Sequence, residues 1–351
     1  MSDSVSVGMA DTDRRGVAPV GLLTTSRIRR SPFADHVEAA GVKGYTVYNH
    51  MLLPLVYRSL EEDYRHLKEH VQLWDVAAQR QVEISGPDSG RLVQWMTPRD
   101  LSWAEIGQCF YAPLVDETGG MVNDPVILKL ADDRFWLSLA DSDVLLWARG
   151  LASAGGFDVA IAEPDVSPLA VQGPKSEDLM AAVFGEAVRA IGFFRFARLA
   201  FDGHDFVVAR SGWSKQGGFE IYVDDATLAG DLWDTLLRAG APFGVGPGCP
   251  NVIERIEGGL LSYGGDMTLE HNPFECGLGT YCHLDRPIAF LGRERLEAIQ
   301  AAGIERQIRG LVIDVPSMPF CTTPWPVSRG GETVGQVTSA AFSPDAGRGL
   351  A

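Results

Sequence analysis

The chain has 351 residues, 46% hydrophobic and 22% charged, so it is long enough for two or three globular domains. Its formal net charge of −16 argues against nucleic acid or an anionic membrane as the main partner, because binding to phosphates needs a basic surface. No segment approaches the ~18 to 20 apolar residues of a membrane span, and the polar N-terminus lacks the apolar stretch of a secretion signal.

Five cysteines form no CxxC pair, and their odd number excludes a complete disulfide framework. We therefore expect buried or free thiols in a reducing compartment and predict a cytoplasmic protein. Residues 1–25 are predicted to be a disordered leader. The short cluster Arg27, Arg29 and Arg30 is interpreted as a solvated arm, with a polyanion site as the alternative.

The first strongly periodic segment is a predicted helix over residues 60–73, whose first turn is acidic. His66 and His70 lie four residues apart on it and would share a face. No HExxH pattern surrounds them, so a surface histidine pair is favoured over a metal site.

The middle of the chain mixes strands and helices irregularly. Strands are predicted over 81–84, 110–115, 126–130, 135–139, 194–201 and 206–209 and near Leu169, and helices over 89–95, 142–152 and 176–184. This order lacks a regular βαβ alternation and predicts an α+β fold. Neither GxGxxG nor GxxxxGK[ST] occurs in a suitable context, so nucleotide-phosphate binding has no support.

A predicted hairpin follows, with the sequence RSGWSKQGGFEIY over residues 210–222. An exposed turn needs no Trp, Lys, Gln or Glu, and a buried one must satisfy every polar group. Further on, a helix over 292–301 and short strands over 307–315, 325–327 and 333–338 predict a separate small β domain.

The segment GGMVNDPV places Asp124 after a glycine turn and just before a strand. Aspartate in such a place is most often a backbone cap. The functional alternative is a fixed carboxylate that points into a cleft.

Several motifs, in this order, resemble the aminomethyltransferase (glycine-cleavage T-protein) family. They are Tyr111, Gly119-Gly120, Asn123-Asp124, LAVQGP (169–174), RSGWSKQGGFEI, ERIEGG (254–259) and NPFECGLG (272–279). The segments YTVYNHMLLP, NDPVILKLADDRFWLSLADSD and CPNVIERIEGGLLSYG look most like the dimethylsulfoniopropionate (DMSP) demethylase branch. The resemblance implies a three-domain, cloverleaf-like α+β fold with a central folate channel.

By this resemblance, domain 1 covers 26–79 and 165–264 and binds folate, domain 2 covers 80–164 and 265–303, and a C-terminal β domain covers 304–351. In the family the last domain continues past the segment TSAAFSP, so we expect a truncated domain here. A shortened sheet exposes an edge that invites self-association, which leaves a homodimer open.

The implied activity is methyl transfer from DMSP to tetrahydrofolate, which yields 5-methyltetrahydrofolate and methylmercaptopropionate. Two alternatives remain: a folate-dependent aminomethyl or methyl transferase with another donor (glycine-cleavage type, betaine or aryl ether), and a folate-binding protein without turnover. The KGCYxGQE signature of the noncatalytic relatives is absent, which makes a folate-binding protein without turnover a weaker alternative without eliminating it. The expected partners are small molecules.

The resemblance also implies the site. The folate-binding residues by motif position are Tyr111, Asp124, Trp213, Glu220, Tyr222 and Arg255. Asp124 is also the candidate catalytic residue, because a carboxylate can stabilise the charge on the methylated nitrogen and take its proton. The donor's cation is expected against Trp213, Tyr111 or another aromatic ring.

Three positions depart from the T-protein pattern. Lys215 and Gln216 replace the Gly-Glu of the hairpin motif, and Pro250 stands where an Arg is usual. The hairpin turn is thus expected to differ where a carrier-linked amine would be handled.

Overall fold

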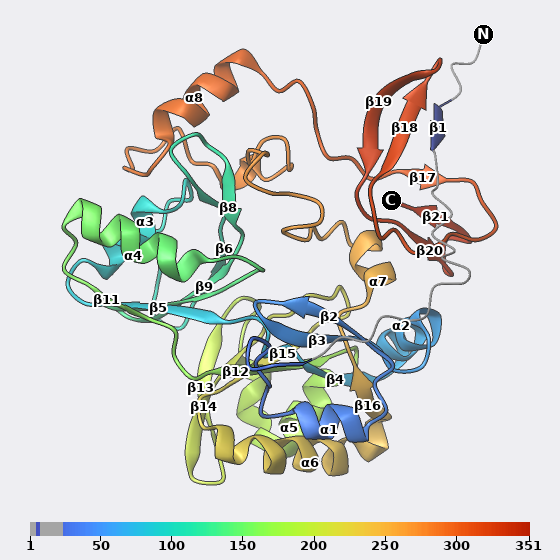
Figure 1. Cartoon of the computed structure of the whole chain (residues 1–351). Coiled ribbons are helices and arrows are strands. Elements are labelled where there is room, and N and C mark those ends of the chain that lie inside the picture. Colours follow the sequence, from blue (N-terminus) through green and yellow to red (C-terminus); the bar gives the residue numbers. More distant parts are fainter. Residues whose placement is uncertain (1–4, 8–23) are drawn as a thin grey trace.

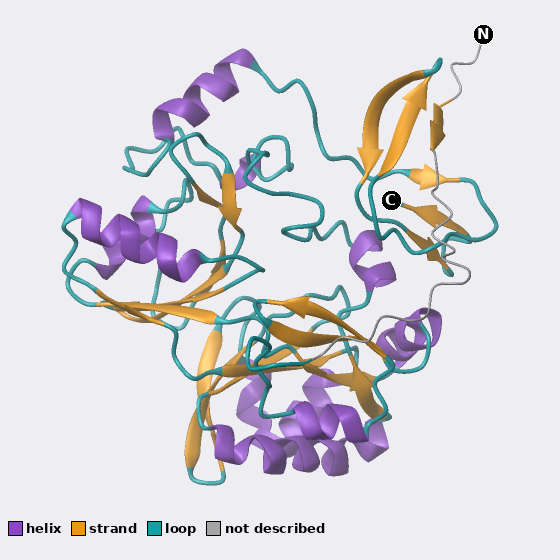
Figure 2. Cartoon of the chain, viewed as in Figure 1, coloured by secondary structure: helices purple, strands orange, loops and turns teal. Residues whose placement is uncertain are grey.

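The computed structural model describes residues 5–7 and 24–351 (Figures 1 and 2). The α-helices are α1 (Ala34–Ala39), α2 (Leu60–Glu69), α3 (Ser89–Trp95), α4 (Val144–Gly155), α5 (Ser176–Phe184), α6 (Ala229–Gly240), α7 (Val252–Glu257) and α8 (Arg293–Ala302). Short 3-10 helices cover Glu186–Ala190, Ala226–Leu228, Ala241–Phe243 and Gly279–Tyr281. No helix in this part of the chain is long and apolar enough to cross a bilayer.

The strands up to residue 172 are β1 (Val5–Val7), β2 (Gly44–Tyr48), β3 (Met51–Val56), β4 (Val71–Asp75), β5 (Gln81–Ser85), β6 (Cys109–Tyr111), β7 (Leu114–Val115), β8 (Met121–Asn123), β9 (Val126–Ala131), β10 (Arg134–Ser138), β11 (Ala160–Ala162) and β12 (Ser167–Gln172). The later strands are β13 (Phe196–Phe201), β14 (His204–Ala209), β15 (Gly218–Val223), β16 (Val245–Gly248), β17 (Val312–Ile313), β18 (Trp325–Arg329), β19 (Glu332–Val337), β20 (Ala341–Ser343) and β21 (Arg348–Leu350).

The largest sheet has six strands in the order β13-β14-β15-β12-β4-β16, antiparallel except for the β4–β16 pair. Helices α1, α5 and α6 cover one face, seen below the sheet in Figure 1. Strand β15 is buried on both faces, because Phe219 and Ile221 point to these helices while Tyr222 points the other way. The β14–β15 hairpin is therefore an interior wall.

The second sheet has five antiparallel strands in the order β11-β5-β10-β9-β6, with α3 and α4 packed on one face. Its other face meets the six-stranded sheet, where Trp136 and Leu128 pack against Val207 and Tyr222. The two sheets thus bury a shared layer of side chains, and the groups of that layer must be apolar or hydrogen-bonded.

The β2–β3 hairpin is tied to the loop after β10 by one asparagine. Asn49 and His50 form its turn with φ of +47° and +60°. The buried Asn49 side chain donates to Ala78 O at 3.0 Å and to Ala140 O at 3.3 Å, and its backbone N–H donates to Asp141 Oδ1 at 2.8 Å. These bonds hold the hairpin, including Tyr48, at the junction of the two sheets.

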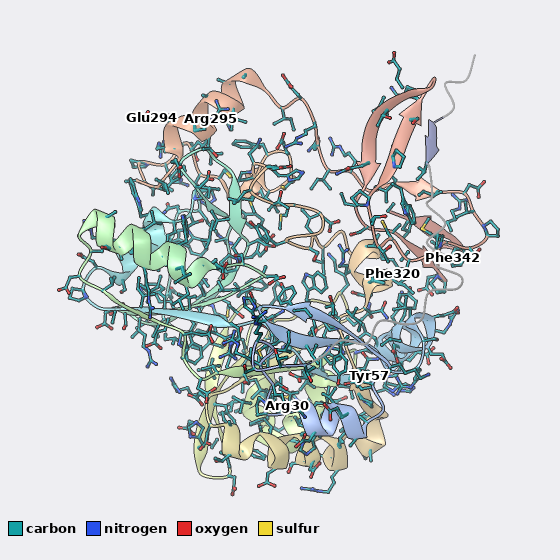
Figure 3. The ribbon with its side chains drawn as sticks, viewed as in Figure 1. Arg30, Tyr57, Glu294, Arg295, Phe320 and Phe342 are labelled. Carbon is teal, nitrogen blue, oxygen red and sulfur yellow. The ribbon has the colours of Figure 1, made fainter. Side chains whose placement is uncertain are left out.

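The C-terminal region contains two three-stranded sheets, β1-β18-β19 and β17-β21-β20. Figure 3 labels landmarks of the molecule: Arg30 and Tyr57 beside the six-stranded sheet, Glu294 and Arg295 on α8, and Phe320 and Phe342 in the C-terminal region. The prediction of a disordered leader over 1–25 falls mainly on residues 1–4 and 8–23, which lie outside the described residues. It is wrong for Val5–Val7, which pair with β18 because Val7 packs against the Trp325 cluster.

Several predicted elements differ from the structure by a few residues at their ends, and three differ more. The strand predicted over 307–315 is reduced to β17, Val312–Ile313. The helix predicted over 60–73 ends at Glu69, because His70 leaves the helical region and Val71–Asp75 become a fully buried strand. The strand predicted over 110–115 is divided into β6 and β7, which belong to different sheets. The division of the chain into three domains with the predicted boundaries stays a prediction.

The loop between β14 and β15 approaches Gln172 so closely that two of its positions require glycine. A Cβ on Gly212 (φ +151°) would lie 2.1 Å from Gln172 Nε2, and one on Gly218 (φ +155°) would lie 2.4 Å from the carbonyl oxygen of Val171. In exchange, Gln172 Nε2 donates to Ser211 O at 3.1 Å and its Oε1 accepts from Ser214 Oγ at 2.8 Å.

Replacement of Gly218 by alanine should therefore destabilise the protein by about 3 kcal/mol, because the added methyl meets a backbone carbonyl that cannot move aside. Gly217→Ala is the matched control: its φ is +79° but nothing lies within 4 Å, so about 1 kcal/mol is expected. Thermal unfolding midpoints of both variants check this, and equal midpoints would refute the close approach.

Candidate active site

Tyr111 and Asp124 form the first half of the site. Tyr111 ends β6 and Asp124 follows β8, and the Tyr111 hydroxyl donates to Asp124 Oδ2 at 2.9 Å. The other oxygen, Asp124 Oδ1, is buried and has no hydrogen-bond partner within the described residues. A buried acceptor without a donor is costly, so this oxygen is suited to a donor that a ligand brings.

The backbone around Asp124 is fixed from both sides. Asn123 is fully buried, and its Nδ2 donates to Ala140 O at 3.1 Å and Ser142 Oγ at 2.8 Å. Gly120 passes so close to Leu269 that a Cβ would lie 2.4 Å from its carbonyl oxygen. The residues of the motif GGMVND therefore fix the position of the Asp124 carboxylate, beyond forming a turn.

Burial raises the pKa of Asp124 to about 7, against the opposing effect of the Tyr111 hydrogen bond. Burial and then the Asp124 charge also raise the pKa values of Tyr48 and Tyr111, and that of Tyr263 to about 12. Three phenols from separate parts of the chain thus lie near one carboxylate. Tyr48 and Tyr263 escaped the sequence analysis because only the tertiary fold brings them here.

Glu220 and Tyr222 form the second half, on the inward face of β15. Glu220 is 6% exposed and accepts from Ser211 Oγ; burial raises its pKa. Tyr222 is fully enclosed with its ring 5.9 Å from that of Trp136, and burial followed by the Glu220 charge holds its pKa well above the ordinary value. The predicted folate contacts of both residues stay predictions.

Trp213 and Arg255 lie together but are not both free for a ligand. Arg255 Cζ lies 5.7 Å from the centre of the half-buried Trp213 ring. Arg255 also forms a buried ion pair with Asp266 at 2.7 Å and donates to Leu260 O and Ser339 Oγ. The guanidinium is thus committed to protein partners, and its charge disfavours a cationic donor on this face of Trp213.

Lys215 and Gln216, which depart from the T-protein pattern, are hydrogen-bonded to Glu254 of the ERIEGG motif. Glu254 Oε1 accepts from Lys215 N at 2.7 Å and from Gln216 Nε2 at 3.1 Å. The buried Glu254 thereby holds the tip of the hairpin loop.

His66 of α2 and His70, which follows the helix, are half-buried rather than on the surface as predicted, and their ring centres are 5.0 Å apart. Burial, Arg58 and His70 lower the pKa of His66 to about 4. His70 Nδ1 lies 3.1 Å from Lys175 Nζ. No group of three or more metal-binding side chains is found over 5–7 and 24–351.

The Asp124→Asn variant should gain stability over the parent as pH rises. The folded pKa of about 7 exceeds the unfolded value of about 3.9, so the stability that the neutral carboxyl provides is complete below the unfolded value and lost as pH rises through 7. We expect a gain on the order of 2 kcal/mol at pH 8 relative to pH 5, allowing for residual exposure. Urea unfolding at both pH values tests this, with Asp132→Asn on the exposed β9–β10 turn as control; a pH-independent difference would contradict it.

The Asp266→Asn variant should lose about 3 kcal/mol at pH 7, because Arg255 is left buried without its counter-charge. Although burial opposes it, the Arg255 charge lowers the pKa of Asp266, so the loss should shrink only when the pH falls below the ordinary aspartate range. The control Asp345→Asn breaks the half-exposed pair with Lys68 and should cost less than about 1 kcal/mol. Chemical unfolding that ranks the two variants equally would argue against this role.

Known proteins resemble this chain in sequence and in fold. The family model described as the GCVT N-terminal domain matches residues 33–286. The dimethylsulfoniopropionate demethylase DmdA of Ruegeria pomeroyi is 58% identical over 94% of this chain and 90% of the relative, and an aminomethyltransferase of Bacillus mycoides is 31% identical over 90% and 87%. The crystal structure of the glycine cleavage system aminomethyltransferase T from Bartonella henselae superposes with a TM-score of 0.79 at 23% identity, covering 92% of this chain and 88% of that one. The predicted T-protein-like α+β fold is therefore confirmed, and the chain belongs to the GCVT family of aminomethyltransferases.

Proposed function

We propose that this protein transfers a methyl group from DMSP to tetrahydrofolate and releases methylmercaptopropionate. The choice of donor is supported by 58% identity to a protein named DMSP demethylase over nearly the whole chain. The observation that supports the chemistry is the buried Asp124 carboxylate, which has one oxygen on Tyr111 and the other without a partner in the described residues.

Two acceptors fit the pterin of tetrahydrofolate. Asp124 Oδ1 can accept from a ring N–H, and the Glu220 carboxylate of β15 is suited to the amino group and ring N–H of the guanidine-like edge. Tetrahydrofolate supplies the nucleophilic nitrogen N5. We assign its orientation to Tyr111, Asp124, Glu220 and Tyr222.

The reaction is a displacement at the methyl carbon. The N5 lone pair forms the new N–C bond while the S–C bond breaks, its electrons go to sulfur, and a neutral thioether leaves without acid assistance. Alignment of the two substrates can supply ~7 to 11 kcal/mol of the barrier. With a pKa of about 7, Asp124 is substantially ionised near neutral pH and can take the proton that N5 loses, directly or through water.

The sulfonium cation is assigned to the Asp124 side of the site. Tyr48, Tyr111 and Tyr263 are aromatic side chains on which the Asp124 charge acts, and a desolvated cation gains ~1 to 2 kcal/mol from such a ring. Trp213 is the poorer place, because Arg255 lies against its ring.

The setting we propose is the cytoplasm, with small-molecule substrates. All five cysteines are free thiols, and four of them are buried, which suits a reducing compartment. Self-association as a homodimer stays a prediction.

Incubation of the purified protein with tetrahydrofolate and DMSP without oxygen tests the proposal, with mass detection of both products. We expect 5-methyltetrahydrofolate and methylmercaptopropionate in equal amounts, and a loss of rate of about 10²-fold or more in Asp124→Ala. Glu105→Gln, which removes an exposed partner of Arg195, is the control and should keep the parent rate.

Folate binding without product would reject DMSP as donor and favour an amine, betaine or aryl ether, which a donor panel then separates. A full rate in Asp124→Ala would reject the catalytic assignment.

A further inference from the structure

Arg99 is a half-buried cation surrounded by aromatic rings rather than by carboxylates. It lies in the loop between α3 and β6, half-buried, and its guanidinium carbon is 5.1 Å from the ring centre of Tyr281 and 5.7 Å from those of Trp103 and Phe110. One of its terminal nitrogens donates to the backbone oxygen of Tyr111. Its Nε is buried and has no acceptor within the residues that the structure describes.

Other arginines of similar or greater burial are matched with a carboxylate. Arg58 pairs with Asp63 at 2.9 Å, Arg80 with Glu163 at 3.2 Å and Arg255 with Asp266 at 2.7 Å. No such pair is found for Arg99 over 5–7 and 24–351, and burial lowers its pKa. Aromatic faces offset part of the cost of removing a cation from water, but they do not neutralise it.

The position of Arg99 connects it to the reacting centre. The Tyr281 ring packs edge-on against Tyr111 with 5.2 Å between ring centres, and the Tyr111 hydroxyl binds Asp124. On the other side Trp103 is 47% exposed, so the cluster reaches solvent. An elongated ligand with its reacting atom beside Asp124 could therefore place an acidic end at Arg99.

We propose that Arg99 binds a substrate carboxylate. The planar fork of N–H donors fits a carboxylate in two-point contact, and a chain of net charge −16 needs a local cation for any anionic ligand. The inference rests on the proposed function, in which both substrates qualify: the donor has one carboxylate, and the folate has those of its glutamate tail.

Steady-state kinetics of Arg99→Gln and Arg99→Lys test the assignment. Loss of a charge-assisted bond should raise one KM roughly tenfold or more in Arg99→Gln, and less in Arg99→Lys, which keeps the charge but not the fork. Arg134→Gln is the matched control, because Arg134 pairs with Glu83 on β5 at 2.7 Å, and it should keep both KM values. Arg99→Lys also serves if the glutamine variant does not fold.

Equilibrium titrations separate the two sources of the carboxylate. If the glutamate tail is bound, Arg99→Gln weakens the binding of tetrahydrofolate but not of tetrahydropteroate, which lacks glutamate. If the donor is bound, the KM for DMSP rises and both titrations match the parent.

Unchanged KM values and unchanged folate binding would overturn the inference, even with a lowered kcat, since Arg99 would then only position Tyr111. Absence of product from the parent enzyme would instead reject the proposed function. The folate titrations then decide the inference alone, and equal affinity in Arg99→Gln would overturn it.

Discussion

The candidate site is organised around a carboxylate held in the protein interior, with no cation paired to it among the residues that the structure describes. Asp124 has a single hydroxyl partner, and burial shifts its pKa upward. Asp266, which is also buried, has Arg255, two hydroxyls and a backbone N–H as partners, and its pKa is shifted downward. The same residue type thus has opposite pKa shifts: Asp124 can exchange a proton near neutrality, while Asp266 stays ionised there and supports the structure.

The two halves of the site come from different sheets, and the C-terminal region supports one of them. Thr338 and Ser339 donate to Asp266, which binds Arg255, whose guanidinium lies against Trp213 of the β14–β15 loop. A separate bond from Ser343 to Glu257 joins β20 to α7. The position of the Trp213 wall therefore depends on residues more than a hundred positions further along the chain.

Local patterns predicted much of this arrangement. The bounds of α3 are those expected from the sequence, and Tyr111 and Asp124, which the resemblance assigned to one site, share a hydrogen bond. The helix over 60–73 was too long, because a short apolar run after His70 has the same pattern in a buried strand and in a helix. Arg99 could not be recognised as a binding residue from the sequence. What distinguishes it is the lack of a carboxylate partner among the described residues, and only the tertiary structure shows which side chains surround it.

The loop from Gly212 to Gly218 has a backbone path set by Gln172 and by Glu254, whereas the Lys215 side chain faces outward. Positions 212 and 218 admit no side chain, but Lys215 is exposed and Gln216 only half-buried. Lys215 binds Glu254 through its backbone N–H alone, so its side chain can be exchanged without loss of the bond that holds the loop. A substitution at Lys215 can thus change what the tip of the loop presents to solvent, with no insertion or refolding of the wall.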